Sequence, residues 1–261
     1  MAWHWLIARK SWNLDPILSW ALIRNREVFM AALCNAWLSG MVMTVTIVQI
    51  PQRFMIVDRL SPIDSGVRLL PFAAVMVSTS VLVTVAIAKF KVFAVTSLIL
   101  GALLEIAVVA GFSRASTHVG IEPSQYVFQI LAGVCVGICN IILLLLTPHL
   151  VEKEDLAVGN GAINQIRILG GSLGLSIVTV ATTPTLQANL VKVIGPEQTA
   201  RVLDRTNQIQ ILSLPSETQA VIIESFGTLY NTQMAILIGI SAAQVVASML
   251  QWQRKEIILK K

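Results

Sequence analysis

Charged residues are scarce in this chain. Only 13% of its 261 residues are Asp, Glu, Lys or Arg, whereas 55% are hydrophobic. A soluble domain carries about 25% charge, so this balance excludes an ordinary water-soluble enzyme. The net charge of +5 indicates Lys and Arg that face the cytoplasm and an anionic lipid leaflet, and does not predict nucleic-acid binding. The lipid bilayer is therefore the first partner that the composition predicts.

Groups that carry out covalent or metal chemistry are also rare. The three cysteines lie inside apolar stretches, so no extracellular disulfide framework is expected. Cys135 and Cys139 share one helix face, but no His or second cysteine pair joins them as a metal site would require. The three histidines are scattered, and the chain has no G-x-S-x-G, H-E-x-x-H or Gly-Lys-Ser/Thr phosphate loop. We therefore expect no catalytic residue, metal or cofactor, and expect any transport to draw on an ion gradient.

Six long apolar blocks are what the sequence does contain. They lie near residues 30–52, 67–88, 92–112, 124–148, 161–183 and 233–251. Crossing a hydrocarbon core of roughly 30 Å takes about 20 helical residues, and in lipid a helix pairs all of its own backbone polar groups. The sequence therefore predicts an all-α integral membrane protein, in which residues 28–252 form a six-helix transmembrane bundle.

The segments between and beyond the blocks predict the orientation. Residues 1–27 hold four of the six tryptophans, which favour the headgroup region, so this segment is expected at the membrane surface. Loops on one side of the bundle carry eleven Lys and Arg and those on the other side seven, with Arg167 left out because it falls inside a span. This excess predicts that both termini, including the basic tail 253–261, are cytoplasmic. The one long connection, 184–232, is then extracellular.

Polar residues inside the blocks are the candidate functional residues. Glu105 lies well inside the third block, where an ionised side chain costs about 2.5–3.5 kcal/mol on insertion scales. It is a candidate for proton coupling, and the alternative is a neutral carboxyl hydrogen-bonded within the bundle. Four amides are candidates for a transport path, although each could equally form a hydrogen bond between helices. These amides are Asn35, Gln49, Asn140 and Gln165.

Other residues in and near the spans are candidates for structural or gating roles. Gly170 and Gly174 form a GxxxG pair, a spacing that lets two helices approach closely in lipid. The interpretation as plain helix packing and the interpretation as a sliding contact both remain open. Arg167 either extends to the cytoplasmic surface or holds an internal charge pair. Arg68 lies in a connection that is crowded with arginines.

Several ordered stretches resemble a known family. They resemble the C-terminal half of major facilitator superfamily transporters of fungi, most of all the fourteen-helix drug:proton antiporter branch. The stretches are 23–29 (IRNREVF), 50–54 (IPQRF), 60–62 (LSP), 65–72 (SGVRLLPF), 155–158 (DLAV) and 161–175 (GAINQIRILGGSLGL). The resemblance implies proton-coupled efflux of small hydrophobic compounds, such as drugs, toxins or secondary metabolites, across the plasma membrane.

The chain departs from this pattern in two ways. Met55 and Arg59 stand where the resemblance leads us to expect Gln and Gly. The chain also holds one six-helix bundle, whereas a full transporter of this family has two, with the substrate between them. Three interpretations remain: a truncated transporter, a half-transporter that pairs with a second copy or a missing N-terminal bundle, and a non-transporting membrane interaction or regulatory subunit.

Overall fold

The structure, a computed structural model, describes residues 27–90, 92–204, 216–252 and 258–259. Its elements are α3 (Glu27–Ile56), α4 (Pro62–Val67), α5 (Leu70–Lys89), β1 (Val92–Phe93), α6 (Ala94–Phe112), α7 (Pro123–Leu150), α8 (Leu156–Asp204), α10 (Ser216–Met249) and β2 (Ile258–Leu259). This described part contains six helices that are long and apolar enough to cross a membrane. The all-α membrane bundle predicted from the sequence is thereby confirmed, with one two-residue strand pair added to it.

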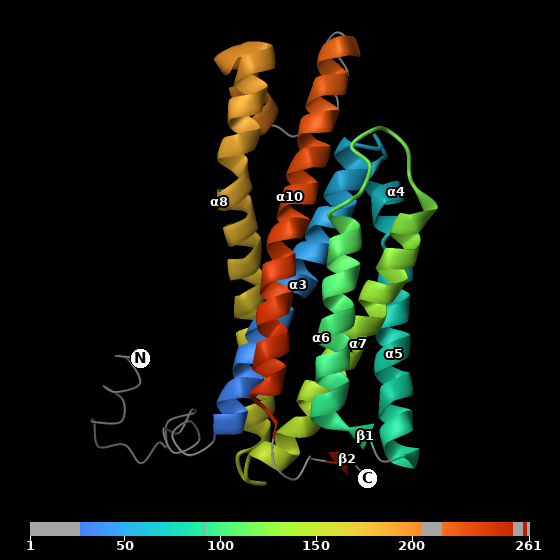
Figure 1. The fold of residues 1–261 in the computed structure, drawn as a ribbon, viewed down its shortest axis with the longest axis vertical. Coiled ribbons are helices and arrows are strands. Elements are labelled where there is room, and N and C mark those ends of the chain that lie inside the picture. Colours follow the sequence, from blue (N-terminus) through green and yellow to red (C-terminus); the bar gives the residue numbers. More distant parts are fainter. Residues whose placement is uncertain (1–26, 91, 205–215, 253–257, 260–261) are drawn as a thin grey trace, which may run out of the picture.

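The long helices run up and down side by side in one bundle (Figure 1). α3 begins and α10 ends at the same end of the bundle, where β1 pairs with β2 in antiparallel fashion. We call this the terminal end, and we call the opposite end, where α3 is followed by α4, the far end. The predicted surface segment 1–27 lies outside the described residues except for Glu27, and the predicted tail 253–261 does so except for β2.

Glycines allow two pairs of helices to approach closely. α8 packs along α3, and a Cβ atom at Gly40 of α3 or at Gly170 of α8 would overlap backbone atoms of the facing helix. α7 packs along α5 in the same way, because a Cβ atom at Gly133 or Gly137 would stand 2.7 Å from a carbonyl oxygen of α5. Small residues at four-residue spacing are therefore what sets these interhelical distances.

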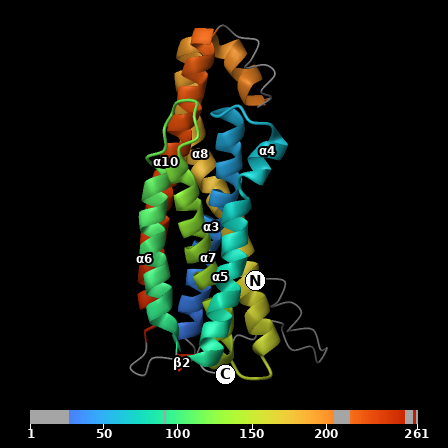
Figure 2. The same ribbon diagram turned by 90° about the vertical axis from the view of Figure 1, so that its right-hand side faces the viewer.

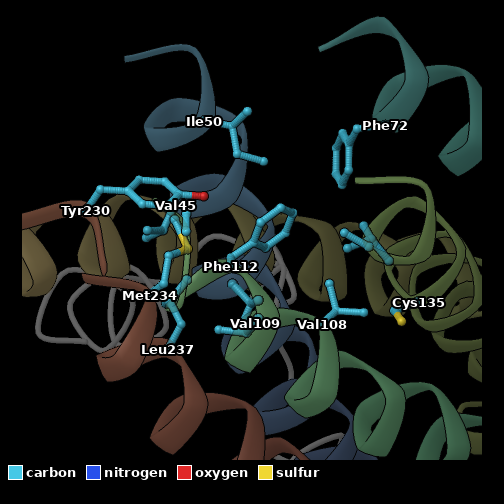
Figure 3. Packing of buried hydrophobic residues seen from close by; sticks show 14 of the residues in the cluster. Val45, Ile50, Phe72, Val108, Val109, Phe112, Cys135, Tyr230, Met234 and Leu237 are labelled. Carbon is cyan, nitrogen blue, oxygen red and sulfur yellow. The ribbon is translucent and has the colours of Figure 1, made fainter. Parts of the chain in front are cut away.

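Apolar side chains from all parts of the bundle fill its interior. Figure 3 shows the cluster nearer the far end, in which Phe112 of α6 lies between Ile50 of α3, Phe72 of α5 and Tyr230 of α10. A second cluster nearer the terminal end joins α3, α6, α7 and α8. Many large apolar residues of α5 are exposed instead, as expected for a helix at the lipid-facing perimeter.

α8 and α10 continue well past the predicted spans and project beyond their neighbours at the far end (Figures 1 and 2). The structure thus differs from the expected connection 184–232, because α8 is helical to Asp204, with one break at Gly195, and α10 begins at Ser216. Proline and glycine indicated a loop here, but apolar residues of the two extensions pack together, and this packing outweighs the local preference. These buried residues are Leu186, Leu190, Ile222, Ile223 and Phe226, and Val57 from the turn after α3 packs with them.

Candidate functional site

Glu105 lies in the middle of α6 with its side chain 3% exposed. Gln244 of α10 is its side-chain neighbour, and the Gln244 Nε2 group also donates to Cys139 Sγ of α7 over 3.7 Å. The Oε2 atom of Glu105 has no hydrogen-bond partner among the described residues. A carboxyl, an amide and a thiol from three helices therefore meet in the bundle interior, where ionising the carboxyl would leave its charge without a counter-ion.

Arg167 of α8 is another charged residue inside the bundle. Its Nε and Nη2 atoms are buried without a hydrogen-bond partner in the part of the chain that the structure describes. The Cys139 thiol lies close enough to both Arg167 and Glu105 to interact electrostatically with each side chain. Arg167 and Glu105 do not form an ion pair with each other, and none of the residues that the structure describes forms an internal charge pair with Arg167.

The four candidate path residues do not come together. Asn35 of α3 is fully buried and donates through Nδ2 to Ser248 Oγ of α10 over 2.7 Å. Asn140 of α7 donates to Met43 Sδ over 3.5 Å, which is a weak contact between two helices. Gln165 is exposed on α8. Gln49 is buried on α3 and lines a cavity nearer the far end. A role for these residues in a transport path therefore stays a prediction.

A cavity of about 460 Å³ lies between α3, α8 and α10 toward the far end. Apolar residues of all three helices form most of its wall, among them Leu175, Phe226 and Leu229. Its polar lining consists of Gln49, Gln52, Arg53, Thr179, Thr183, Tyr230 and Gln233. A volume of this size falls within the range of sites for small organic molecules.

A buried network around Arg53 is the part of the site that the sequence did not predict. Arg53 was counted among the loop charges, but it lies in the last turn of α3 and is 4% exposed. Its Nη1 group donates to Asp58 Oδ2 over 3.2 Å and to Gln125 Oε1 over 2.8 Å, and Nη2 donates to the Ser116 carbonyl over 2.7 Å. One guanidinium thus joins α3, the connection after α6 and the start of α7.

Asp58 completes this network from the connection that follows α3. Its Oδ1 atom accepts the Gly120 N–H over 3.1 Å. Burial raises the pKa of Asp58 above its ordinary value of 3.8, and the Gly120 N–H and the charges of Arg53 and Arg68 offset this effect only in part. Arg68 is half-buried and donates to the Tyr126 hydroxyl of α7. Arg68 therefore lies beside the network and links the start of α5 to α7, which fits the structural role predicted for it.

The glycines proposed for structural or gating roles lie at the contact between α3 and α8. Gly170 faces the backbone of Trp37, and a Cβ atom at Gly174 would stand 2.7 Å from the Cβ atom of Met41. Both glycines are buried. Close packing is thus what this geometry requires of them, and a gating role remains a prediction. In residues 27–90, 92–204, 216–252 and 258–259, no group of three His, Cys, Asp or Glu residues is placed to hold a metal ion.

Fold and site together define an integral membrane bundle of six long apolar helices within the described residues. No protein-family model matches the chain. It is 28% identical to the MFS-type transporter FPY5 of Fusarium mangiferae over 98% of its own length and 42% of that protein. It is 25% identical to the MFS efflux transporter inpD of Emericella nidulans over 78% of its length and 40% of that protein. The predicted resemblance to fungal major facilitator transporters is therefore confirmed.

A third relative matches a shorter region. This is the MFS-type transporter ltbE of Aspergillus luteorubrus, which is 28% identical over 49% of this chain and 23% of that protein. The chain spans less than half the length of each of these three relatives. All three relatives are named as transporters.

Proposed function

We propose that this chain forms one half of a proton-coupled efflux transporter for small hydrophobic compounds. The buried carboxyl of Glu105 is the observation that carries the proposal. An acidic side chain placed between membrane helices without a counter-ion is suited to binding and releasing a proton. Burying the ionised carboxylate there costs free energy, so the loss of the proton favours a different arrangement of the helices. The similarity to a transporter named for efflux supports the direction of transport.

In this proposal, Gln244 and Cys139 position the Glu105 carboxyl. The amide of Gln244 reaches both the carboxyl and the Cys139 thiol, so it couples α10, α6 and α7 at one point. Loss of the proton would create a charge that these helices can stabilise only by moving closer to a donor or to water. A proton-dependent change in helix packing is the event that would drive export.

A second bundle completes the transporter in this proposal. Transporters of this type alternate access by rocking one bundle against another around a site near the midplane. α8 supports such a contact, since polar residues follow one of its exposed faces. These residues are Gln165, Ser172 and Ser176. Either an N-terminal bundle or a second copy of this chain would cover that face, with the termini in the cytoplasm and the transporter in the plasma membrane.

Reconstitution into liposomes tests the proposal. The chain is incorporated into vesicles with an acidic interior that contains a trapped pH-sensitive dye, and hydrophobic compounds are added outside. Export coupling predicts a compound-dependent rise of the internal pH, which Glu105→Gln should abolish because the amide cannot carry the proton. Glu224→Gln, at an exposed glutamate of α10, is the matched control and should leave the flux intact.

Two results would contradict the proposal. Equal flux in the Glu105→Gln variant would remove the proton-coupling role from this residue. A complete absence of compound-dependent flux, with the chain alone and with a co-expressed second bundle, would favour a non-transporting interaction or regulatory role. Light scattering of the purified protein separates a single bundle from a pair of copies.

A further inference from the structure

A half-open cavity of about 370 Å³ lies between α6 and α7, near the connection that joins them at the far end (Figure 1). Three small residues on one face of α6, Ala107, Ala110 and Gly111, form part of its wall. Phe128 of α7 also lines the cavity, and its ring lies so close to Gly111 that a Cβ atom there would overlap it. The apolar part of the cavity is therefore a groove between two helices.

The groove lies beside the surrounding lipid. α6 and α7 are both long and apolar enough to cross a membrane. Leu103 of α6, one turn before Ala107, is 49% exposed, and Val127 of α7, next to Phe128, is 55% exposed. In a bilayer such side chains lie against lipid chains, so a lipid is the molecule that is adjacent to this cavity.

Two residues of opposite charge lie where the groove reaches the end of the two helices. Arg114 follows the last turn of α6 and Glu122 immediately precedes α7, and both line the cavity and are exposed. The Arg114 guanidinium has no hydrogen-bond or ion-pair partner among the described residues. The Glu122 carboxylate accepts a hydrogen bond from Ser124 Oγ over 3.2 Å. A positive and a negative group therefore share one cavity without pairing with each other.

We propose that this cavity binds a zwitterionic phospholipid from the leaflet at the far end. The phosphate accepts hydrogen bonds from the Arg114 guanidinium, whose planar fork of donors matches phosphate oxygens. The ammonium group donates to the Glu122 carboxylate, and one acyl chain lies in the groove against Ala107 and Phe128. A headgroup that carries a phosphate and no ammonium would bring a second negative charge to Glu122, so the two residues favour a zwitterion.

The groove distinguishes a lipid from a water-soluble phosphate compound. Exposed ion pairs contribute little on their own, so the two charges select the headgroup, and the apolar contacts of the chain supply most of the affinity. The inference goes beyond the proposed export function and does not depend on it, because lipid binding here needs neither a proton gradient nor a second bundle.

Photolabelling of the purified full chain in detergent micelles tests the binding. The probe is a phosphatidylethanolamine with a diazirine in one acyl chain, and the labelled residues are located by mass spectrometry. We expect saturable labelling at the end of α6 and the start of α7. Palmitoyl-oleoyl phosphatidylethanolamine should displace the probe, the matching phosphatidylglycerol should do so about three- to fivefold less well, and glycerophosphoethanolamine, which has no acyl chains, should not displace it.

Three results of this experiment would overturn the proposal. Labelling spread evenly over the lipid-facing residues of α5 would show unspecific contact with lipid. Equal displacement by the two lipids would contradict recognition of the ammonium group. Displacement by glycerophosphoethanolamine at the concentrations at which the lipid acts would contradict the role of the acyl chain.

Charge variants separate recognition of the headgroup from a structural role. Arg114→Ala should weaken the binding of both lipids about three- to fivefold, because both carry a phosphate. Glu122→Gln should remove the preference for phosphatidylethanolamine and leave the affinity for phosphatidylglycerol no weaker than before. Equal loss of the two lipids in Glu122→Gln would overturn the assignment. Arg59→Ala and Glu224→Gln, at exposed positions outside the cavity, are the matched controls and should change neither affinity.

A variant that fills the groove tests its role. Ala107→Phe should abolish the saturable labelling, whereas Ala235→Phe, the same change at an exposed alanine of α10 outside the cavity, should not. Unchanged labelling in Ala107→Phe would overturn the site. Saturable labelling without any transport in liposomes would support the site and contradict the export function. Flux that depends on Glu105, together with labelling spread over α5, would do the reverse.

Discussion

The bundle buries charge in two regions, and the two regions treat that charge differently. At the far end, Arg53 and Asp58 form an ion pair and share their remaining hydrogen-bonding groups with Gln125, Ser116 and Gly120. In the middle of the bundle, Glu105 and Arg167 stay apart, and each has buried polar atoms without a partner among the described residues. A paired charge mainly holds segments together, whereas an unpaired charge costs stability and is retained where it serves a function.

The largest expected effect breaks the paired region. Arg53→Met removes the guanidinium and leaves the buried Asp58 without its ion-pair partner. Removing one member of a buried ion pair costs about 3–5 kcal/mol, so the midpoint of thermal unfolding in detergent should fall strongly. Arg59→Met is the control, because Arg59 is exposed and donates to Gln219 Oε1 over 2.9 Å at the surface. Similar midpoints for the two variants would show that the network does not stabilise the bundle.

A smaller effect is expected at the contact between α3 and α8, which is the contact that positions Arg167. Gly170→Val introduces a side chain against the backbone of Trp37 and should force α8 away from α3. Overpacking of this kind costs about 1–3 kcal/mol, measured as the loss of unfolding free energy. Gly161→Val on the same helix should cost much less, since nothing lies within 4 Å of a Cβ atom there. Equal costs at the two positions would contradict close packing as the reason for glycine at position 170.

The smallest effect concerns the protonation of Asp58. Burial raises its pKa above 3.8 in the folded protein, so the folded state keeps this proton over a pH range in which the unfolded state has released it. Its contribution to the free energy of unfolding should therefore fall as the pH rises from 3.8 through the raised pKa, and stay constant above it. Unfolding midpoints recorded across that range should show this decline in the wild type and lack it in Asp58→Asn.

Asp64→Asn is the matched control for this pH series. Asp64 is exposed in α4, where its carboxylate accepts a hydrogen bond from Ser61 Oγ over 2.7 Å. This variant should retain the decline of the wild type. A decline that also persists in Asp58→Asn would mean that another group is responsible.

The membrane spans could be predicted because hydrophobic length alone decides them in lipid. The burial of Glu105 followed from its position between Leu104 and Ile106 in an uninterrupted apolar block. A close helix contact at Gly170 and Gly174 followed from their spacing, although the spacing did not identify α3 as the partner. These features depend on local sequence, so a single amino-acid sequence is sufficient to predict them.

The positions that could not be predicted depend on contacts between distant segments. In the sequence, Arg53 has the features of a charge in a loop. Its burial could not be predicted because its acceptors, Ser116 and Gln125, lie more than sixty residues further along the chain. Gln165 lies inside a predicted span, but its exposure depends on how α8 is rotated against α3 and α10. The continuation of α8 past Pro184 depends on its packing with α10. Hydrophobic pattern carries none of this information.

The length of α8 has a mechanical consequence. From Leu156 to the break at Gly195, this helix measures about 60 Å at a rise of 1.5 Å per residue. If it pivots at its close contact with α3 near Gly174, about 30 Å from Gly195, a tilt of about ten degrees displaces its tip by about 5 Å, which is half the diameter of a helix. A rotation that keeps the glycine contact as its pivot is therefore amplified along the helix into a movement that a distance probe can detect at the tip.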